Sequence, residues 1–158
     1  MNAGRVLIIG YGNVLRGDDA VGPYVVETLR EDPRLAGAQI ISCPQLTPEL
    51  AEYVGSADLV VLIDARVDDG APGTVRVDPI AAGERSRSSV SHLVHAGELV
   101  DLARAVFGAS PAVMAVSVGA VRFGFGEELS SEVLAAVPFV MDAVVRLARC
   151  PSTVAPVG

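Results

Sequence analysis

Three short apolar runs constrain the fold of this chain more than any other feature of its sequence. They span residues 6–9, 59–63 and 112–118, and almost none of their positions is polar. A strand with one face in water alternates between apolar and polar residues, whereas a strand covered on both faces is apolar throughout. The three runs therefore predict the central strands of a parallel sheet that has helices on both of its faces.

The segments between these runs complete an α/β pattern. Residues 39–42 and 73–77 indicate two further strands, the second of them less buried, and residues 81–91 a loop. Four helices are expected, the first of them over about 21–31 and the second starting at Thr47-Pro48-Glu49. In the last helix, Ser130 is the expected N-cap, and Pro138 should kink the helix or require local repair.

The core-facing positions expected in the last two helices are Leu99, Val100, Leu102, Ala103, Val106, Val133, Leu134, Val137, Val140, Met141, Val144 and Leu147. The order of elements predicts a single three-layer αβα domain over 1–150, with a twisted, mostly parallel sheet flanked by helices. A flexible tail is expected over 151–158.

Charge and cysteine content exclude several kinds of partner. A formal net charge of −7 offers no basic face to nucleic acid or to an anionic membrane. No apolar run approaches the roughly 20 residues that span a membrane, and the start of the chain is interpreted as a strand and not as a signal peptide. Cys43 and Cys150 form no CxxC pair, which is typical of lone thiols in a reduced compartment. We therefore expect a cytoplasmic protein.

Three segments place metal-binding or acid–base side chains at the predicted carboxyl ends of strands, where sites gather in open α/β sheets. The first is the loop 10–22, GYGNVLRGDDAVG, which contains Asp18 and Asp19. The second is Asp64, directly after the run 59–63. The third holds His92 and His95, ahead of the third helix.

Each signal also has a structural interpretation, because an acid can cap a helix and a loop histidine needs no function. A dinucleotide-binding loop is excluded, since Leu15 stands where a third glycine is needed and the paired acids would repel a pyrophosphate. Together, two carboxylates and an imidazole predict a three-ligand site for Zn²⁺ or Ni²⁺. The site should hold metal weakly, because no thiolate takes part.

The same segments resemble motifs of the hydrogenase-maturation endopeptidases. The family's opening motif is a strand followed by GxGN, two hydrophobic residues and a pair of acids, and residues 8–22, IIGYGNVLRGDDAVG, are similar to it. Its apolar strand ending in Asp-Ala resembles VVLIDA at 60–65, and its Ser-His before a Leu/Ala-rich helix resembles Ser91-His92. The resemblance runs from about Arg5 to Arg149.

This resemblance implies a peptidase that clips the C-terminal extension from the precursor of a [NiFe]-hydrogenase large subunit. The residues that contact nickel already seated in that precursor would be Asp19, Asp64 and His92. Nickel would then come with the substrate, and the free protein would take up Zn²⁺ or Cd²⁺ only weakly. Either the metal or one of the two carboxylates would activate the attacking water.

Two departures from the family pattern bear on which hydrogenase is processed. Ala20 replaces the glycine common after the acidic pair, and Cys43-Pro44-Gln45 replaces a Gly-rich segment. Two other functions also fit the residues: an unrelated metal-dependent amidase, or a non-catalytic nickel-binding checkpoint protein of hydrogenase assembly. His95 is the alternative imidazole, although the family spacing favours His92. A monomer is expected, since acting on one large partner needs no oligomer.

Overall fold

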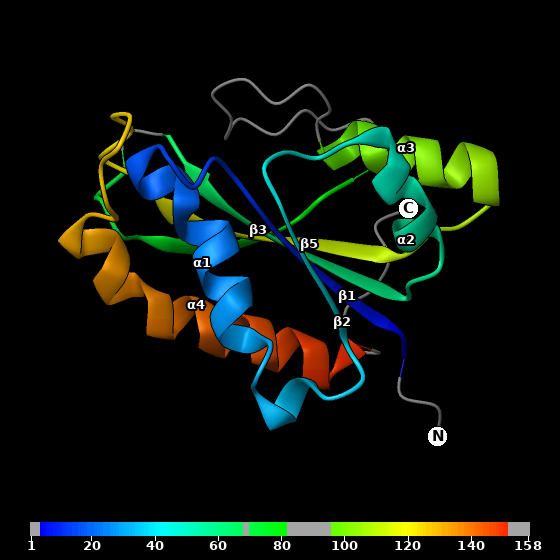
Figure 1. Cartoon of the computed structure of the whole chain (residues 1–158). Coiled ribbons are helices and arrows are strands. Elements are labelled where there is room, and N and C mark those ends of the chain that lie inside the picture. The colour runs from blue at the N-terminus through cyan, green and yellow to red at the C-terminus, as the bar shows by residue number, and fades with distance from the viewer. Residues whose placement is uncertain (1–3, 68–69, 82–95, 152–158) are drawn as a thin grey trace.

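The computed structural model describes residues 4–67, 70–81 and 96–151, and within these ranges five strands form one sheet (Figure 1). The strand order is β2-β1-β3-β5-β4. The parallel members are β1 (Val6–Tyr11), β2 (Gln39–Cys43), β3 (Leu59–Arg66) and β5 (Ala112–Gly119). The edge strand β4 (Val75–Pro79) is antiparallel to β5 and mostly exposed, as expected for a less buried strand.

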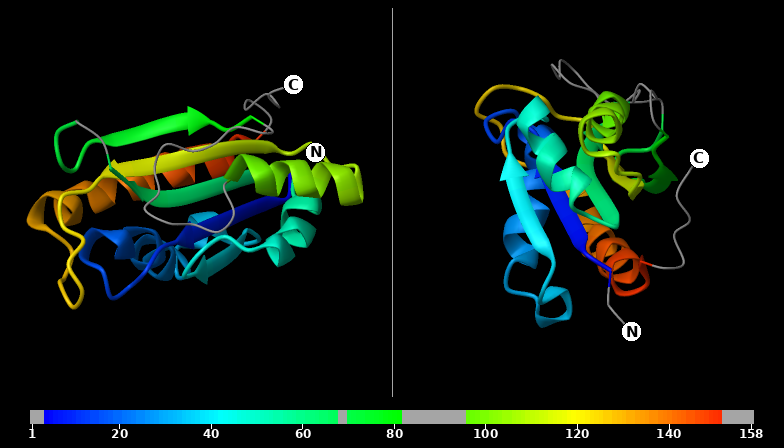
Figure 2. Two further views of the ribbon diagram at one scale, coloured as in Figure 1. Left: turned by 90° about the horizontal axis from the view of Figure 1, so that it is seen from above. Right: turned by 90° about the vertical axis from the view of Figure 1, so that its right-hand side faces the viewer.

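Helices cover both faces of the sheet (Figure 2). On one face lie α1 (Val21–Leu29) and α4 (Ser131–Arg149), and on the other lie α2 (Ala51–Gly55) and α3 (Ala96–Phe107). Three short 3₁₀ helices complete the described elements: η1 (Gly17–Ala20), η2 (Pro33–Leu35) and η3 (Pro48–Leu50). The predicted three-layer αβα arrangement with a mostly parallel sheet is confirmed.

The central strands contribute side chains to two hydrophobic cores, one on each face of the sheet. They are apolar throughout because both of their faces are buried. Ile8 and Ile63 pack under α1 and α4, whereas Leu7, Ile9 and Leu62 pack under α2 and α3. Burying one such side chain stabilises the fold by about 1.5–3 kcal/mol. Because successive residues of a strand point to opposite faces, a polar residue that follows the buried run also belongs to one definite face.

Several details of the helices differ from the prediction. Leu134 and Val106 are exposed, because each lies at the margin of its helix's buried stripe and none of the described elements covers it. Pro138 does not interrupt α4: it lies on the exposed face, where solvent can hydrogen-bond the carbonyl that its ring leaves without a donor. Thr47 precedes η3 without a side-chain cap hydrogen bond.

Part of the prediction falls outside the described residues. This holds for most of the loop at 81–91, for both histidines and for the tail after Pro151. Among the residues that are described, none of the helices is long and apolar enough to cross a bilayer.

Candidate functional site

The register of the sheet brings two site residues side by side at the carboxyl end of the central strands. Gly10 of β1 lies opposite Ile63 of β3, so the next residues along, Tyr11 and Asp64, are neighbours. Both are buried, and strand alternation places both on the face that α2 and α3 cover. The predicted site residue Asp64 therefore ends a buried strand beside a buried phenol.

The pKa of the Tyr11 hydroxyl depends on both of the predicted carboxylates. Burial raises the pKa of its hydroxyl well above the usual value, and the charge of Asp64 and a hydrogen bond to that carboxylate raise it further. Cys43 and Asp19 act in the same direction. The hydroxyl therefore stays protonated beside the Asp64 carboxylate. Asp64 thus lies beside this phenol, and the charge of Asp19, from a different segment, acts on the same hydroxyl.

The adjacent acids of the loop after β1 have different surroundings, and Asp18 is a structural anchor. Its side chain is fully buried and accepts four hydrogen bonds. Oδ2 accepts from the backbone N–H groups of Val121 and Arg122, both at 2.9 Å, and from the Ser130 hydroxyl at 2.9 Å. Oδ1 accepts from the Ser130 N–H at 2.7 Å. Asp18 thus fastens the loop after β1 to the segment that leads from β5 into α4.

Asp19, unlike Asp18, has a carboxylate that is available to the candidate site. It is partly exposed, and its Oδ2 accepts the N–H of Asn13 at 2.7 Å, which closes the loop on itself. Neither aspartate caps α1, whose N-cap is Ala20 without a side-chain hydrogen bond. Gly12 makes this loop possible: its φ is 149°, and a Cβ there would overlap the Asp19 carbonyl oxygen.

Close packing of glycines sets the distance between α1 and the sheet. A Cβ on Gly22 would lie 2.5 Å from the Ile63 carbonyl oxygen and 2.7 Å from the Tyr11 nitrogen, and one on Gly10 would overlap the Gly22 carbonyl. The first turn of α1 therefore rests directly on the ends of β1 and β3. This contact positions η1, and with it Asp19, beside the strand that carries Asp64.

Other polar residues share this edge and face of the sheet. Arg66, two residues beyond Asp64 and also buried, donates to the Ser117 hydroxyl at 2.7 Å and to the Thr74 carbonyl at 3.1 Å. Neither Tyr11 nor Arg66 was given a role by the sequence prediction. Strand alternation would have indicated both, because residues 9 and 11, like residues 64 and 66, point to the same face.

The third predicted site residue, His92, lies outside the described residues, as does His95. In the part of the chain that is described, which excludes both histidines, no three His, Cys, Asp or Glu side chains form a metal-binding group. The structure therefore brings together Asp19 and Asp64. Two carboxylates are hard donors that suit a divalent cation, and an imidazole would complete a set acceptable to Ni²⁺ or Zn²⁺.

Comparison with known proteins points to one family. No protein-family model matches the chain. Over 79 residues, 49% of its length, it is 37% identical to the hydrogenase expression/formation protein HoxM of Azotobacter vinelandii, and the matched stretch is 38% of that protein. The [NiFe] hydrogenase maturation protease HybD from Thermococcus kodakarensis superposes with a TM-score of 0.74 at 26% identity, covering 91% of this chain and 99% of that one. The chain resembles the hydrogenase maturation proteases in fold and in sequence.

The hydrogenase maturating endopeptidase HybD from E. coli shares the fold as well. Its TM-score is 0.77 with 94% of this chain and 93% of that chain covered, at 23% identity. The family resemblance read from the three sequence motifs is thus confirmed, and the solved structures that carry it are peptidases.

Proposed function

We propose that the chain is a hydrogenase-maturation endopeptidase that removes the C-terminal extension of a nickel-loaded [NiFe]-hydrogenase large-subunit precursor. The observation that carries the proposal is the position of Asp64 beside Tyr11 at the carboxyl edge of the sheet, with the helix turn that follows Asp19 packed on the ends of the same strands. The fold is shared with the maturation proteases, and open α/β sheets of this kind gather their sites at such an edge.

In this proposal the nickel belongs to the substrate. Asp19, Asp64 and His92 contact the ion seated in the precursor, and thiolates of the precursor complete its coordination. A set of two carboxylates and one imidazole binds a divalent ion too weakly to hold it alone, because no soft donor takes part. Cleavage therefore depends on metal loading, and an unloaded precursor is left intact.

Hydrolysis needs a water that can attack and a carbonyl that can be attacked. A divalent cation beside the scissile bond supplies charge that polarises the carbonyl or acidifies the water. Asp19 is the carboxylate better suited to accept the proton of the water, since it is partly exposed and its other oxygen is held by Asn13. Asp64, buried near the end of a central strand beside Tyr11, is the more rigid of the two contacts to the cation.

The decisive experiment is mass spectrometry of the precursor's C-terminus after incubation with the protein. Wild type should cut the nickel-loaded precursor and leave both nickel-free precursor and a generic unfolded peptide uncut. Asp19→Asn, Asp64→Asn and His92→Ala should each slow cleavage by about 100-fold or more, because general bases and metal contacts contribute on that scale. Asp142→Asn, an exposed acid on α4, and His95→Ala are the matched controls and should cut at the wild-type rate.

Other outcomes select among the alternatives. Stable binding of the precursor without any cut would indicate a non-catalytic checkpoint protein. Equal cutting of all three substrates would indicate an ordinary metal-dependent amidase or peptidase. Loss of activity in His95→Ala but not in His92→Ala would reassign the imidazole.

A further inference from the structure

Two loops, residues 13–17 and 121–128, lie side by side at the carboxyl edge of the sheet, and we call them the paired loops (Figure 1). Backbone hydrogen bonds join them: Gly126 N–H donates to the Leu15 carbonyl at 2.7 Å, and Gly17 N–H donates to the Glu127 carbonyl at 3.1 Å. A third bond runs from the Asp18 N–H to the Arg122 carbonyl at 2.7 Å. Each loop therefore holds the other in a fixed conformation.

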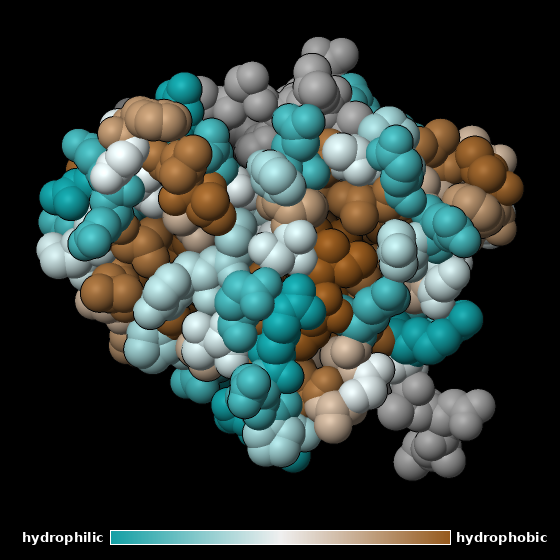
Figure 3. Space-filling model, viewed as in Figure 1, coloured by the Kyte–Doolittle hydropathy of each residue, from teal (hydrophilic) through white to brown (hydrophobic). Residues whose placement is uncertain are grey.

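The paired loops present large apolar side chains to solvent. The exposed fractions are 63% for Val14, 52% for Leu15, 54% for Val121 and 74% for Phe125. Apolar colour gathers at the upper left of the molecule in Figure 3, where the loops lie in Figure 1. Single exposed apolar residues are ordinary, but a group of them on a fixed backbone marks a contact surface.

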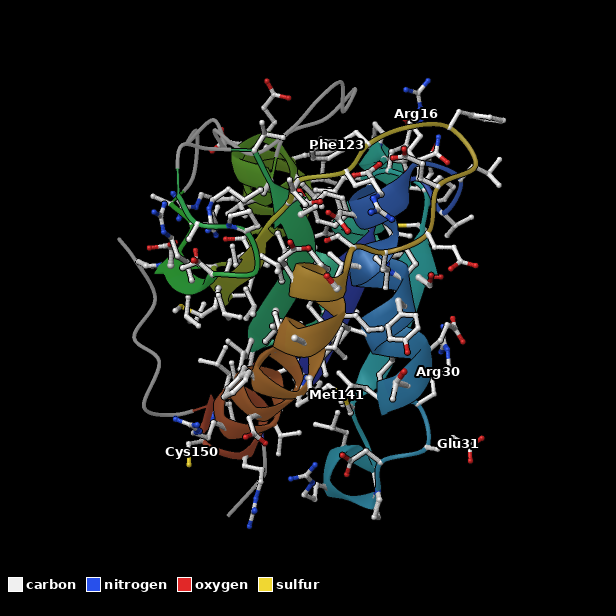
Figure 4. The ribbon with its side chains drawn as sticks, turned by 90° about the vertical axis from the view of Figure 1, so that its left-hand side faces the viewer. Arg16, Arg30, Glu31, Phe123, Met141 and Cys150 are labelled. Carbon is white, nitrogen blue, oxygen red and sulfur yellow. The ribbon has the colours of Figure 1, made fainter. Side chains whose placement is uncertain are left out.

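The paired loops carry no net charge. Residues 13–17 and 121–128 contain two arginines and two glutamates, so the paired loops are neutral in a chain of net charge −7. Arg16 points away from the ribbon at the same end of the molecule as Phe123 (Figure 4). A partner would thus meet apolar side chains first, with charges of both signs around them, which is the usual anatomy of a protein–protein interface.

The paired loops are continuous with the candidate site. The first loop begins at Asn13, whose N–H holds the Asp19 carboxylate, and the second is held by the buried carboxylate of Asp18. A substrate whose scissile bond reaches Asp19 therefore comes close to these loops. A protruding apolar surface of this kind suits a folded body, whereas an extended peptide alone would be met by a groove.

We infer that the paired loops are the docking surface for the folded body of the large-subunit precursor, which contacts them through apolar side chains next to its C-terminal extension. The inference rests on the proposed function and deepens it, since it separates recognition of the folded substrate from chemistry at Asp19 and Asp64. The loops would act on substrate affinity and leave the chemical step unchanged.

The test is a double variant, Leu15→Ser with Phe125→Ser, assayed on the nickel-loaded precursor. We expect KM to rise by about tenfold or more, as for the loss of two apolar anchors, while kcat at saturating precursor stays unchanged. Cd²⁺ uptake by the free protein, measured by calorimetry, should also match wild type. The control is Val106→Ser with Phe139→Ser, which removes apolar groups that are 61% and 68% exposed on α3 and α4, and its KM should equal that of wild type.

Each other result overturns the inference in a distinct way. If the loop variant and the control show the same KM as wild type, the paired loops do not dock the precursor, and the proposed function stands. If wild type neither binds nor cuts the nickel-loaded precursor, the proposed function falls and the inference falls with it. If sedimentation shows a wild-type dimer that the loop variant converts to a monomer, the occupant is a second copy of the chain.

Discussion

At the scale of single residues, the paired acids of the loop after β1 show how position decides the role of a side chain. Asp18 and Asp19 have the same chemistry and adjacent places in the sequence. The turn of η1 directs Asp18 into the protein, where four donors surround its carboxylate, and leaves Asp19 at the edge of the sheet. The sequence motif contains both functions, one structural and one in the candidate site.

Asp18→Asn should therefore destabilise the protein far more than Asp19→Asn. The amide keeps the volume of the carboxylate but turns one acceptor oxygen into a donor that faces other donors. Hydrogen bonds to a charged group contribute about 1.5–3 kcal/mol each, and a group left unsatisfied in the interior costs a similar amount. We expect a loss of about 2–4 kcal/mol for Asp18→Asn and less than about 1 kcal/mol for Asp19→Asn. Urea unfolding of the two variants measures the difference, and equal losses would contradict the assigned roles.

At the scale of elements, the contact between α1 and the sheet determines where Asp19 lies. The first turn of the helix has no side chain between its backbone and the ends of β1 and β3, because Gly22 stands at the contact. A shift of α1 would carry η1 with it. The geometry of the candidate site thus depends on a residue that has no functional group.

Gly22→Ala should displace α1 and weaken the site without removing any ligand. The added Cβ would meet backbone atoms of Ile63 and Tyr11, which cannot move aside as a flexible side chain would. Overpacking of this kind typically costs about 1–3 kcal/mol. We expect a loss of that size in thermal or urea unfolding, together with reduced Cd²⁺ uptake. Thr28→Ala, on the exposed side of the same helix, is the control; if it and Gly22→Ala behave alike, the contact does not position the site.

The elements themselves could be predicted well because the central strands carry an unambiguous pattern. Runs such as 59–63 are apolar on both faces, so they fit only the middle of a covered sheet. The rule that sites gather at strand ends then indicated Asp64 and the loop with Asp19. The exposure of Leu134 could not be predicted, because helical spacing gives a stripe but not the width of its partner. Strand alternation would have indicated the face on which Tyr11 lies. The role of Asp18 arises from contacts with residues more than a hundred positions away, which no local pattern encodes.

At the scale of the whole molecule, the sequence contains no lysine, and all twelve of its basic residues are arginines. Arginine stays charged at any pH at which the protein can fold. With lysine absent, tyrosine is the residue type whose usual pKa lies near 10, and the sequence has three of them. Tyr11 is the buried tyrosine, whereas Tyr24 and Tyr53 are 46% and 42% exposed.

Alkaline stability should for this reason depend on Tyr11. The pKa of its hydroxyl is raised well above 10 in the folded protein, by burial first and by Asp64 second. The neutral phenol thus contributes stability that is fully present below about pH 10, the unfolded value, and that is lost as the pH rises toward the folded value. Tyr11→Phe should make the loss of stability above pH 10 shallower. Urea unfolding between pH 8 and 11 checks this, with Tyr53→Phe as the control; an identical pH dependence in both variants would contradict it.

The hydrogen bonds of Asp18 can form only late in the synthesis of the chain. The four donors that hold its carboxylate come from residues 121, 122 and 130, more than a hundred positions later. Until the ribosome has released that segment, Asp18 has no partners for its charge, and the loop bearing Asp19 lacks its main tether. An incomplete nascent chain therefore lacks the tether of the loop that bears Asp19, so the candidate site can be assembled only after residues 121–130 have been made.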